Sequence, residues 1–309
     1  MPRKRPPGEG RLLQVVYYAY VGGSALARAL PERWVYALAH AAGTAAARRS
    51  KGAAQVARNL ARIVGQPPDS GAVRALVAEA YRSYARYWLE TFRLVREGRE
   101  FFVERFRGIG DENIDKALAE GTGVIVVVGH LGNWDAAGAW VGARGNRLVT
   151  VAEVLRPRRM FEFFAEHRAR LGMTIYGAEP GVTAKLVDEV RRGAVLAILG
   201  DRDLKGNGVV ADFFGEPATF PRGAASIALR AGVPVLIGGV YERPLPDGRR
   251  GWVAEISEPV PLPDPAAADA VEELTRTIAA GLEDCVARHP EQWHVFQPFW
   301  IADRKPRPR

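Results

Sequence analysis

The sequence predicts an α/β protein of one domain, in which helices flank a central, mixed and mostly parallel sheet and a helical part comes first. Up to about residue 99, apolar residues recur every three or four positions, which is typical of amphipathic helices. From residue 121, short β-branched runs alternate with helical stretches. The 309 residues are 48% hydrophobic, and neither a repeat nor a Pro- or Ser-rich linker divides them. We therefore expect a single domain over residues 1–309, with a mostly helical part at 1–99, an α/β part at 100–303 and a basic tail at 304–309.

The N-terminal part is expected to be helical over residues 12–49, 53–64 and 72–94. A break at residues 65–70 precedes the last of these segments, and Ser70 is suited to cap it. In the α/β part, strands are expected at 123–128, 147–151, 174–176, 194–199, 233–241 and 252–256, and helices at 134–143, 157–171, 182–192, 223–231 and 265–289.

Residues 12–27 are expected to form an interfacial helix, because the run is apolar but shorter than the ~20 residues that span a bilayer. The run also imitates a secretory signal, but its three tyrosines and the amphipathic segment that follows it favour a retained helix. The net charge is +8, with basic clusters before this run and at the end of the chain. Such clusters favour an anionic membrane surface and are equally compatible with solubilising tails. They consist of Arg3, Lys4, Arg5 and Arg11, and of Arg304, Lys305, Arg307 and Arg309.

The strongest chemical signal is His130, at the end of the strand expected at residues 123–128 and before a helix that begins at Trp134. In open α/β folds, the carboxyl ends of strands usually carry the site. In a continuous helix, His130 and Asp135 would point about 140° apart. The glycine-rich turn between them is expected to fold Asp135 back toward the imidazole.

A histidine beside a carboxylate can deprotonate a hydroxyl group, since the imidazole titrates near neutral pH and the carboxylate stabilises the imidazolium. Backbone N–H groups of the turn at residues 129–133 are candidates for holding an oxyanion. The five-residue spacing alone is a weak signal, because the chain has 35 acidic residues. The position of His130 between strand and helix strengthens it, whereas a capping or core histidine is the alternative.

The chain resembles the lysophospholipid acyltransferase superfamily, in the branch of the bacterial late lipid A acyltransferases and the phosphatidylinositol mannoside acyltransferases. The run from His130 to Asp135 looks like the His-x4-Asp signature of that superfamily, and the mannoside branch is the closer match. Further motifs of the resemblance follow one another over almost the whole chain. They are residues 59–62, 83–88, 132–135, 150–153, 202–204, 212–216 and 297–303.

The resemblance implies an acyltransferase of lipid biosynthesis, attached peripherally to the cytoplasmic face of the bacterial plasma membrane. It implies acyl-CoA, with palmitoyl as the acyl chain, as the donor and a mannose hydroxyl of a phosphatidylinositol mannoside glycolipid as the acceptor. It also implies that His130, Asp135, Glu153, Arg168 and the block from Asp201 line the site. One departure is that Asp201 stands where a glutamate is expected, so the carboxylate is one methylene shorter and its hydrogen bonds are remade.

Without the resemblance, the same residues are still candidates. Asp201 and Arg202 directly follow an apolar strand, and Asp201 is a second possible partner of His130. Arg202 and Arg168 are suited to phosphate or carboxylate oxygens, and Glu153 to sugar hydroxyls. Surface charge is the alternative for Arg168, and a helix-entry carboxylate is the alternative for Glu153. Asn133 and Trp134, in the His130 turn, are expected to contact substrate.

Other residues suggest structural roles. Cys285 and His294 are expected to be structural, and the aromatic residues Trp293 and Trp300 to be apolar anchors. Scattered histidines and a single cysteine argue against a metal site, and no cofactor is expected. The chain also lacks the phosphate-loop and serine-hydrolase motifs.

Two rival functions stay open at this stage. The first is a late acyltransferase acting on a lipid A precursor or a lysophospholipid, with acyl carrier protein as a possible donor. The second is a non-catalytic binder of anionic surfaces or nucleic acid. A nucleic-acid partner is disfavoured, because the tryptophans lie within apolar patterns rather than beside a basic stripe. The oligomeric state does not follow from the sequence, and a monomer is favoured.

Overall fold

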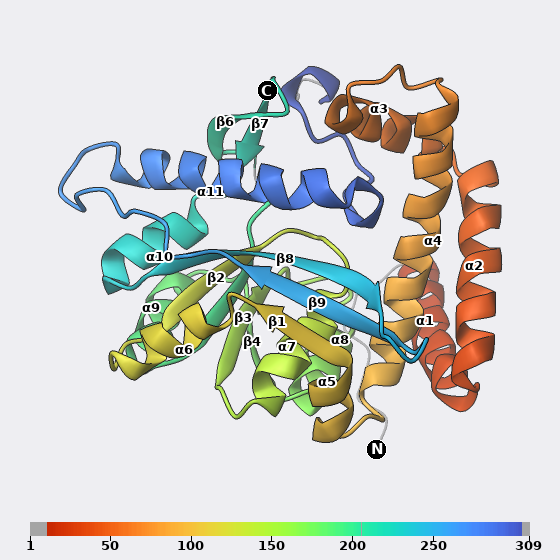
Figure 1. The fold of residues 1–309 in the computed structure, drawn as a ribbon, viewed down its shortest axis with the longest axis horizontal. Coiled ribbons are helices and arrows are strands. Elements are labelled where there is room, and N and C mark those ends of the chain that lie inside the picture. The colour runs from red at the N-terminus through yellow and green to blue at the C-terminus, as the bar shows by residue number, and fades with distance from the viewer. Residues whose placement is uncertain (1–10, 205, 305–309) are drawn as a thin grey trace.

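The computed structural model describes residues 11–204 and 206–304, and it begins with helices (Figure 1). The helices are α1 (Arg11–Ala29), α2 (Glu32–Arg49), α3 (Ala53–Val64) and α4 (Gly71–Leu94). The Ser70 side chain accepts a hydrogen bond from the Val73 N–H and thus caps α4, as the sequence predicts. Helix α4 stands between α2 and the sheet (Figure 1). The helical N-terminal part is confirmed.

The centre of the molecule is a seven-stranded sheet in the order β1-β9-β8-β2-β5-β3-β4. All neighbouring strands are parallel except β8 and β9, so the predicted mixed, mostly parallel sheet is confirmed. Its strands are β1 (Phe106–Ile109), β2 (Val124–Val128), β3 (Leu148–Ala152), β4 (Met173–Gly177), β5 (Val195–Leu199), β8 (Val235–Pro244) and β9 (Arg250–Ile256).

Helices cover both faces of this sheet, which gives three layers (Figure 1). One face packs on α9 (Val182–Arg191), α10 (Gly223–Ala231) and α11 (Ala270–Arg288). The other packs on α5 (Arg99–Arg105), α6 (Glu112–Ala119) and α7 (Trp134–Ala143). The five residues of β2 are all buried, because both of their faces meet apolar side chains. The strand that precedes His130 is therefore held at the middle of the core.

Several elements differ from the sequence-based expectation. Strand β1, helices α5 and α6, and the hairpin of β6 (Val209–Phe213) and β7 (Glu216–Phe220) were not predicted. Helix α11 begins at Ala270 rather than at residue 265, because residues 265–269 form turns. The remaining helix, α8 (Arg158–Arg170), lies within its expected range. Cys285 lies on the buried side of α11, in the core, and Trp293 and Trp300 are buried too, as expected.

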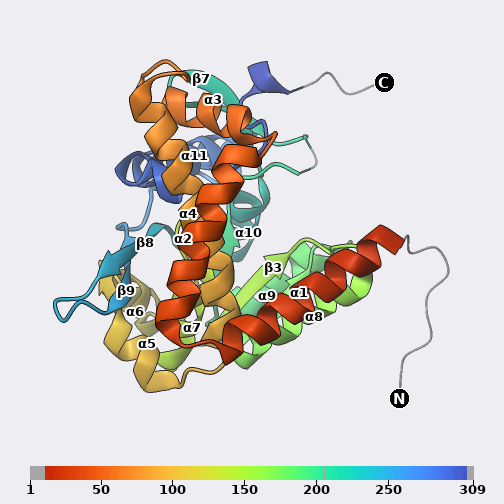
Figure 2. The same cartoon turned by 90° about the vertical axis from the view of Figure 1, so that its right-hand side faces the viewer.

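Helices α1 and α2 lie on the face of the molecule that Figure 2 shows. Within the described part of the chain, these two helices carry half of the exposed large hydrophobic side chains. They are Leu13, Val15, Val16, Tyr18, Leu26, Trp34 and Leu38. None of the described helices is both long and apolar enough to cross a membrane. Arg3, Lys4, Arg5 and most of the basic tail lie outside the described residues.

Gly43 sets how closely α2 approaches α4. A Cβ at this position would lie 2.5 Å from the Arg82 Cα and 2.7 Å from the Tyr81 carbonyl oxygen. Backbone atoms cannot move away as a flexible side chain can. We expect Gly43→Ala to lower the free energy of unfolding by about 1–3 kcal/mol, as overpacking in a core does. Urea unfolding followed by circular dichroism measures this change.

Gly23→Ala is the matched control, because no atom lies within 4 Å of a Cβ built on that residue of α1. Alanine is the better helix former, so this variant should be neutral or more stable by up to ~1 kcal/mol. Equal stability of the two variants would contradict the close contact between α2 and α4.

Candidate active site

The sheet register brings His130 and Asp201 together. Val128, the last residue of β2, pairs with Leu199, the last residue of the parallel neighbour β5. His130 and Asp201 each lie two residues beyond the end of their strand. Because parallel strands end at the same edge, both side chains reach one point beyond the sheet. There the His130 Nδ1 lies 2.6 Å from the Asp201 Oδ1.

Asp201 is fully buried, and protein groups saturate its carboxylate. Besides the imidazole, its Oδ2 accepts hydrogen bonds from the His130 backbone N–H at 2.8 Å and from the Trp293 indole N–H at 2.9 Å. Burial alone would raise the pKa of Asp201. The charge and hydrogen bonds of His130 and the bond from Trp293 outweigh it, so the pKa lies below the usual value.

This pairing determines which nitrogen of His130 can act. An ionised Asp201 accepts a hydrogen bond from the His130 Nδ1–H, so in the neutral imidazole the free lone pair is on Nε2. The His130 side chain is 15% exposed, whereas that of Asp201 is not exposed. The histidine thus has the orientation and access of a general base, with a buried carboxylate behind it.

The turn that carries His130 is held by the C-terminal segment of the chain. The His130 carbonyl accepts a hydrogen bond from the His294 N–H at 2.7 Å, and the Gly132 N–H donates to the Gln292 carbonyl at 2.9 Å. Gly132 has a φ of +59°, and a Cβ there would lie 2.2 Å from the Val240 carbonyl oxygen. The C-terminal segment and Val240 therefore fix the turn on one side.

These bonds also reduce the number of candidate N–H groups for an oxyanion. Of the N–H groups in residues 129–133, those of His130 and Gly132 are already donated, to Asp201 and to Gln292. The two groups are not free to stabilise an oxyanion.

Asp135 does not take the place that the sequence suggested for it. Its carboxylate accepts hydrogen bonds from the Arg168 Nε at 2.6 Å and from the Tyr87 hydroxyl at 2.9 Å. Asn133 caps α7 by accepting the Ala136 N–H at 3.0 Å. The helix therefore starts directly after the turn and carries Asp135 away from the imidazole. The expectation that Asp135 orients His130 is wrong, and Asp201 has that position.

Asp135 and Arg168 form a buried ion pair. Burial alone would raise the pKa of Asp135, but the charge and hydrogen bonds of Arg168 outweigh it and lower that pKa. The Asp135 side chain is 1% exposed and that of Arg168 is 19% exposed. The guanidinium predicted to bind substrate is thus engaged with Asp135, on the inner side of α7.

The other predicted site residues are placed as follows. Glu153 is exposed and directly follows β3, the next parallel strand beyond β5, so it shares the sheet edge with His130 and Asp201. Arg202 is half-buried, and its Nε has no hydrogen-bond partner among the described residues. The Trp134 ring lies against the His130 ring, with centroids 5.2 Å apart. Their contacts with substrate stay predictions.

Helix α4 supplies partners that the sequence analysis missed. The Ser83 hydroxyl contacts the His294 Nε2 at 3.0 Å, and Tyr87 binds Asp135. Glu90 accepts a hydrogen bond from the Asn133 side chain at 2.9 Å. Burial is the larger cause and the charge of His130 the smaller one that together lower the pKa of His294 to about 3, so His294 is neutral at pH 7. The signal for these residues was a polar stripe at three- and four-residue spacing on the inward face of α4.

A sequence model of a known family matches residues 6–301, almost the whole chain. Its description is bacterial lipid A biosynthesis acyltransferase. The chain belongs to this family. It is an acyltransferase, and the resemblance stated from the motifs is confirmed.

Individual proteins with similar sequences agree with this family assignment. The phosphatidylinositol mannoside acyltransferases of two Mycobacterium tuberculosis strains, CDC 1551 and H37Rv, are each 35% identical over 293 residues, which is 93% of this chain and 89% of the relative. The enzyme of the same name from Mycolicibacterium smegmatis is 33% identical over 294 residues, 94% of this chain and 93% of that relative. The acyltransferase therefore aligns with these enzymes over nearly its full length.

The buried ion pair makes a prediction about stability. We expect Arg168→Met to lower the free energy of unfolding by about 3–5 kcal/mol at pH 7, because it leaves the Asp135 charge buried and uncompensated. The lowered pKa of Asp135 means that the ion pair stabilises the fold above pH 3.8, the usual value, and stops doing so as the pH falls through the lowered pKa. In Arg168→Met, burial raises the pKa of Asp135, so the variant binds the proton at a higher pH than the wild type does. The difference between the two proteins should therefore shrink as the pH falls from the raised pKa of the variant toward the lowered pKa of the wild type. Urea unfolding at several pH values measures it.

Arg170→Met is the control on the same helix. Arg170 is 58% exposed and pairs with Glu166, which is 68% exposed. Exposed pairs contribute about 0–1 kcal/mol. If Arg168→Met costs no more than this control, the ion pair does not stabilise the fold.

Proposed function

We propose that this acyltransferase moves a long fatty acyl chain, palmitoyl, from acyl-CoA to a mannose hydroxyl of a phosphatidylinositol mannoside. The observation that carries the chemistry is the buried contact of 2.6 Å between the His130 Nδ1 and Asp201. The acceptor is supported by relatives that are 33% and 35% identical over more than nine-tenths of this chain. Their names identify phosphatidylinositol mannosides as what they acylate.

In this proposal, His130 Nε2 removes the proton of the acceptor hydroxyl as the oxygen attacks the thioester carbonyl. The tetrahedral intermediate then collapses, the new ester forms, and the CoA thiolate leaves. The proton from the acceptor, held on His130, passes to the thiolate. Asp201 stays ionised throughout, because its lowered pKa favours the charged form, and it stabilises the imidazolium. No covalent acyl-enzyme is required, so both substrates bind together.

Purified protein incubated with palmitoyl-CoA and a phosphatidylinositol mannoside should release free thiol and form the acylated glycolipid. We expect His130→Ala to abolish this transfer and Asp201→Asn to lower kcat by about 10²–10⁴-fold, because an amide can neither charge-stabilise the imidazolium nor secure the tautomer. Thiol release and mass spectrometry of the lipid product are the two readouts.

Asp212→Asn is the control for Asp201→Asn. Asp212 lies in the β6–β7 hairpin, where its side chain accepts the Gly215 N–H. This exposed carboxylate should leave kcat unchanged. Near-normal transfer by folded His130→Ala would refute the mechanism. Transfer only to a lipid A precursor or a lysophospholipid, or only from acyl carrier protein, would refute the proposed substrates and keep the reaction type.

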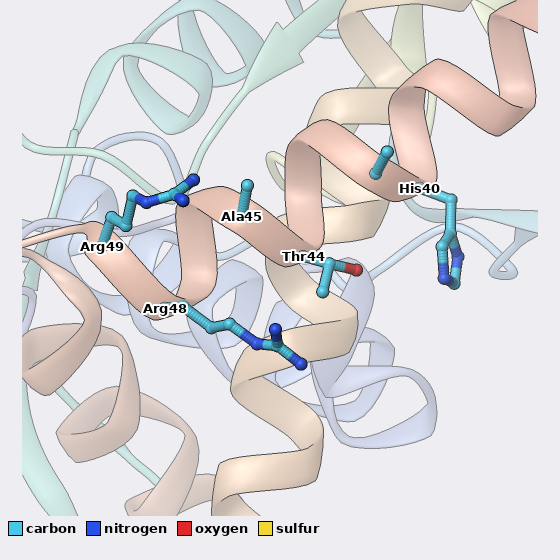
Figure 3. Close-up of a pocket in the computed structure, with 6 residues that line it drawn as sticks. His40, Thr44, Ala45, Arg48 and Arg49 are labelled. Carbon is cyan, nitrogen blue, oxygen red and sulfur yellow. The ribbon is translucent and has the colours of Figure 1, made fainter.

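We also propose that the enzyme binds peripherally to the cytoplasmic face of the plasma membrane through α1 and α2. Exposed apolar side chains concentrate on these helices, including Val15 at 64% and Trp34 at 57% exposure. On α2, Arg48 and Arg49 border an open groove of about 310 Å³ (Figure 3). The groove is separate from the His130 turn, because only residues of α2 line it. They are His40, Ala41, Thr44, Ala45, Arg48 and Arg49. Apolar residues beside arginines suit an anionic bilayer surface.

The double variant Trp34→Ser with Leu38→Ser tests this attachment. We expect it to weaken binding to vesicles that contain phosphatidylglycerol by about tenfold or more, because two apolar side chains are withdrawn from the bilayer. Co-sedimentation measures the binding. Leu262→Ser is the control, since Leu262 is similarly exposed, at 39%, but lies after β9. Equal losses from both variants would contradict attachment through α2.

A further inference from the structure

Glu90 is a buried carboxyl group that the proposed mechanism does not use. It lies on α4 and is 5% exposed. Its Oε2 accepts hydrogen bonds from the Asn133 Nδ2 at 2.9 Å and from the Trp252 indole N–H at 3.3 Å. A charged group is rarely buried without a partner that gains from it. One of these partners, Asn133, belongs to the turn of His130.

Asn133 is held at both ends of its side-chain amide. The Oδ1 accepts the Ala136 N–H at 3.0 Å and so begins α7. The Nδ2 donates to Glu90 on α4. Because Asn133 directly follows Gly132, its position determines where the turn ends and the helix starts. Glu90 therefore holds the last residue of the turn, and Asp201 holds His130 near its start.

Other charged and titratable groups surround Glu90. Tyr36 comes from α2, Arg86 and Tyr87 from α4, Glu242 from β8 and His294 from the C-terminal segment, and several of them line one cavity of about 10 Å³ with Glu90. Arg86 and Arg250 both form ion pairs with Glu242. Burial, and to a smaller extent the negative charge of Glu242, raises the pKa of Glu90 from 4.5 to about 7. The positive charge of Arg86 lowers this pKa but does not outweigh them. The ionised form thus exists at a cost in stability.

We propose that Glu90 is a positioning residue for acyl transfer, which acts by holding Asn133 and thereby the turn that carries His130. It does not touch substrate. The inference rests on the proposed role of His130 as the base. The site tolerates a destabilised carboxylate because a charged acceptor holds the Asn133 amide more firmly than a neutral one does.

Glu90→Gln separates a positioning role from a merely structural one. A positioning residue predicts a variant that is more stable and yet slower, whereas a structural residue predicts that the rate falls only where stability falls. The raised pKa means that the wild-type protein loses stability as the pH rises from 4.5 through about 7, since burial opposes ionisation. Glutamine cannot ionise. The variant should therefore match the wild type in Tm at pH 5 and exceed it by roughly 2–6 °C at pH 8.5.

The same variant should be slower where it is more stable. At pH 8.5 we expect kcat to fall about tenfold with KM within about twofold, because the amide is a weaker acceptor for Asn133. At pH 5.5, where Glu90 is protonated in the wild type, the two rates should converge. A wild-type kcat at every pH, or a kcat that falls only where Tm falls, would overturn the inference.

A second pair of variants tests the route through Asn133. Asn133→Asp keeps an oxygen for the Ala136 N–H but places a carboxylate against Glu90, so kcat should fall by about tenfold or more. In the double variant with Glu90→Gln, the new amide can donate to the carboxylate introduced at position 133. The kcat should then recover by about tenfold relative to Asn133→Asp alone. Purely additive losses would show that Glu90 does not act through residue 133.

Two controls complete the experiment. Glu79→Gln removes another carboxylate of α4, one that is 44% exposed and pairs with Arg82, and it should change neither rate nor pH profile. His130→Ala is measured in parallel. If His130→Ala is inactive and Glu90→Gln is normal, only the positioning inference fails. If His130→Ala is active, the proposed function fails, whatever Glu90 does.

Discussion

The structure depends on one contact between neighbouring parallel strands, that of His130 with Asp201. Because Val128 and Leu199 pair in register, the backbone delivers the two residues to the same height beyond the sheet. The contact of 2.6 Å then requires no long side chain. This explains how an aspartate serves where the resemblance led us to expect a glutamate. Sheet register, and not side-chain length, sets the distance between base and carboxylate.

The rest of the site keeps this contact in place. The C-terminal segment holds the turn through backbone bonds and supplies the Trp293 indole to Asp201. That segment is in turn fastened to α3, where the Asn59 side chain donates to the Val295 and Gln297 carbonyls and Arg62 pairs with Asp303 at 2.8 Å. Residues 59–62 and 297–303 belonged to the family resemblance, and in this structure they fasten the C-terminal segment to α3.

The sequence predicted the strand ends at 128 and 199 correctly, and with them the edge at which the site lies. It could not show that β2 and β5 are neighbours, because five elements separate them along the chain. Asp135 was misjudged for a related reason: a nearby carboxylate looked like a partner, but Asn133 starts α7 at once and directs Asp135 to Tyr87, 48 positions earlier in the chain. The β6–β7 hairpin was missed although its first strand alternates in burial. Its two-residue turn has Phe214, with a φ of +53°, at the position where Asn, Asp or Gly is the usual signal.

Helix α4 joins the two parts of the chain through buried polar contacts. Its Tyr87 and Glu90 lie before residue 99, whereas their partners Asp135 and Asn133 lie after it. A chimera of two relatives joined between α4 and α5 would inherit one half of each buried polar pair from either parent. Such pairs change safely only when both members change together. We therefore expect a chimera joined at this boundary to keep its site only when both parents share the same α4 residues.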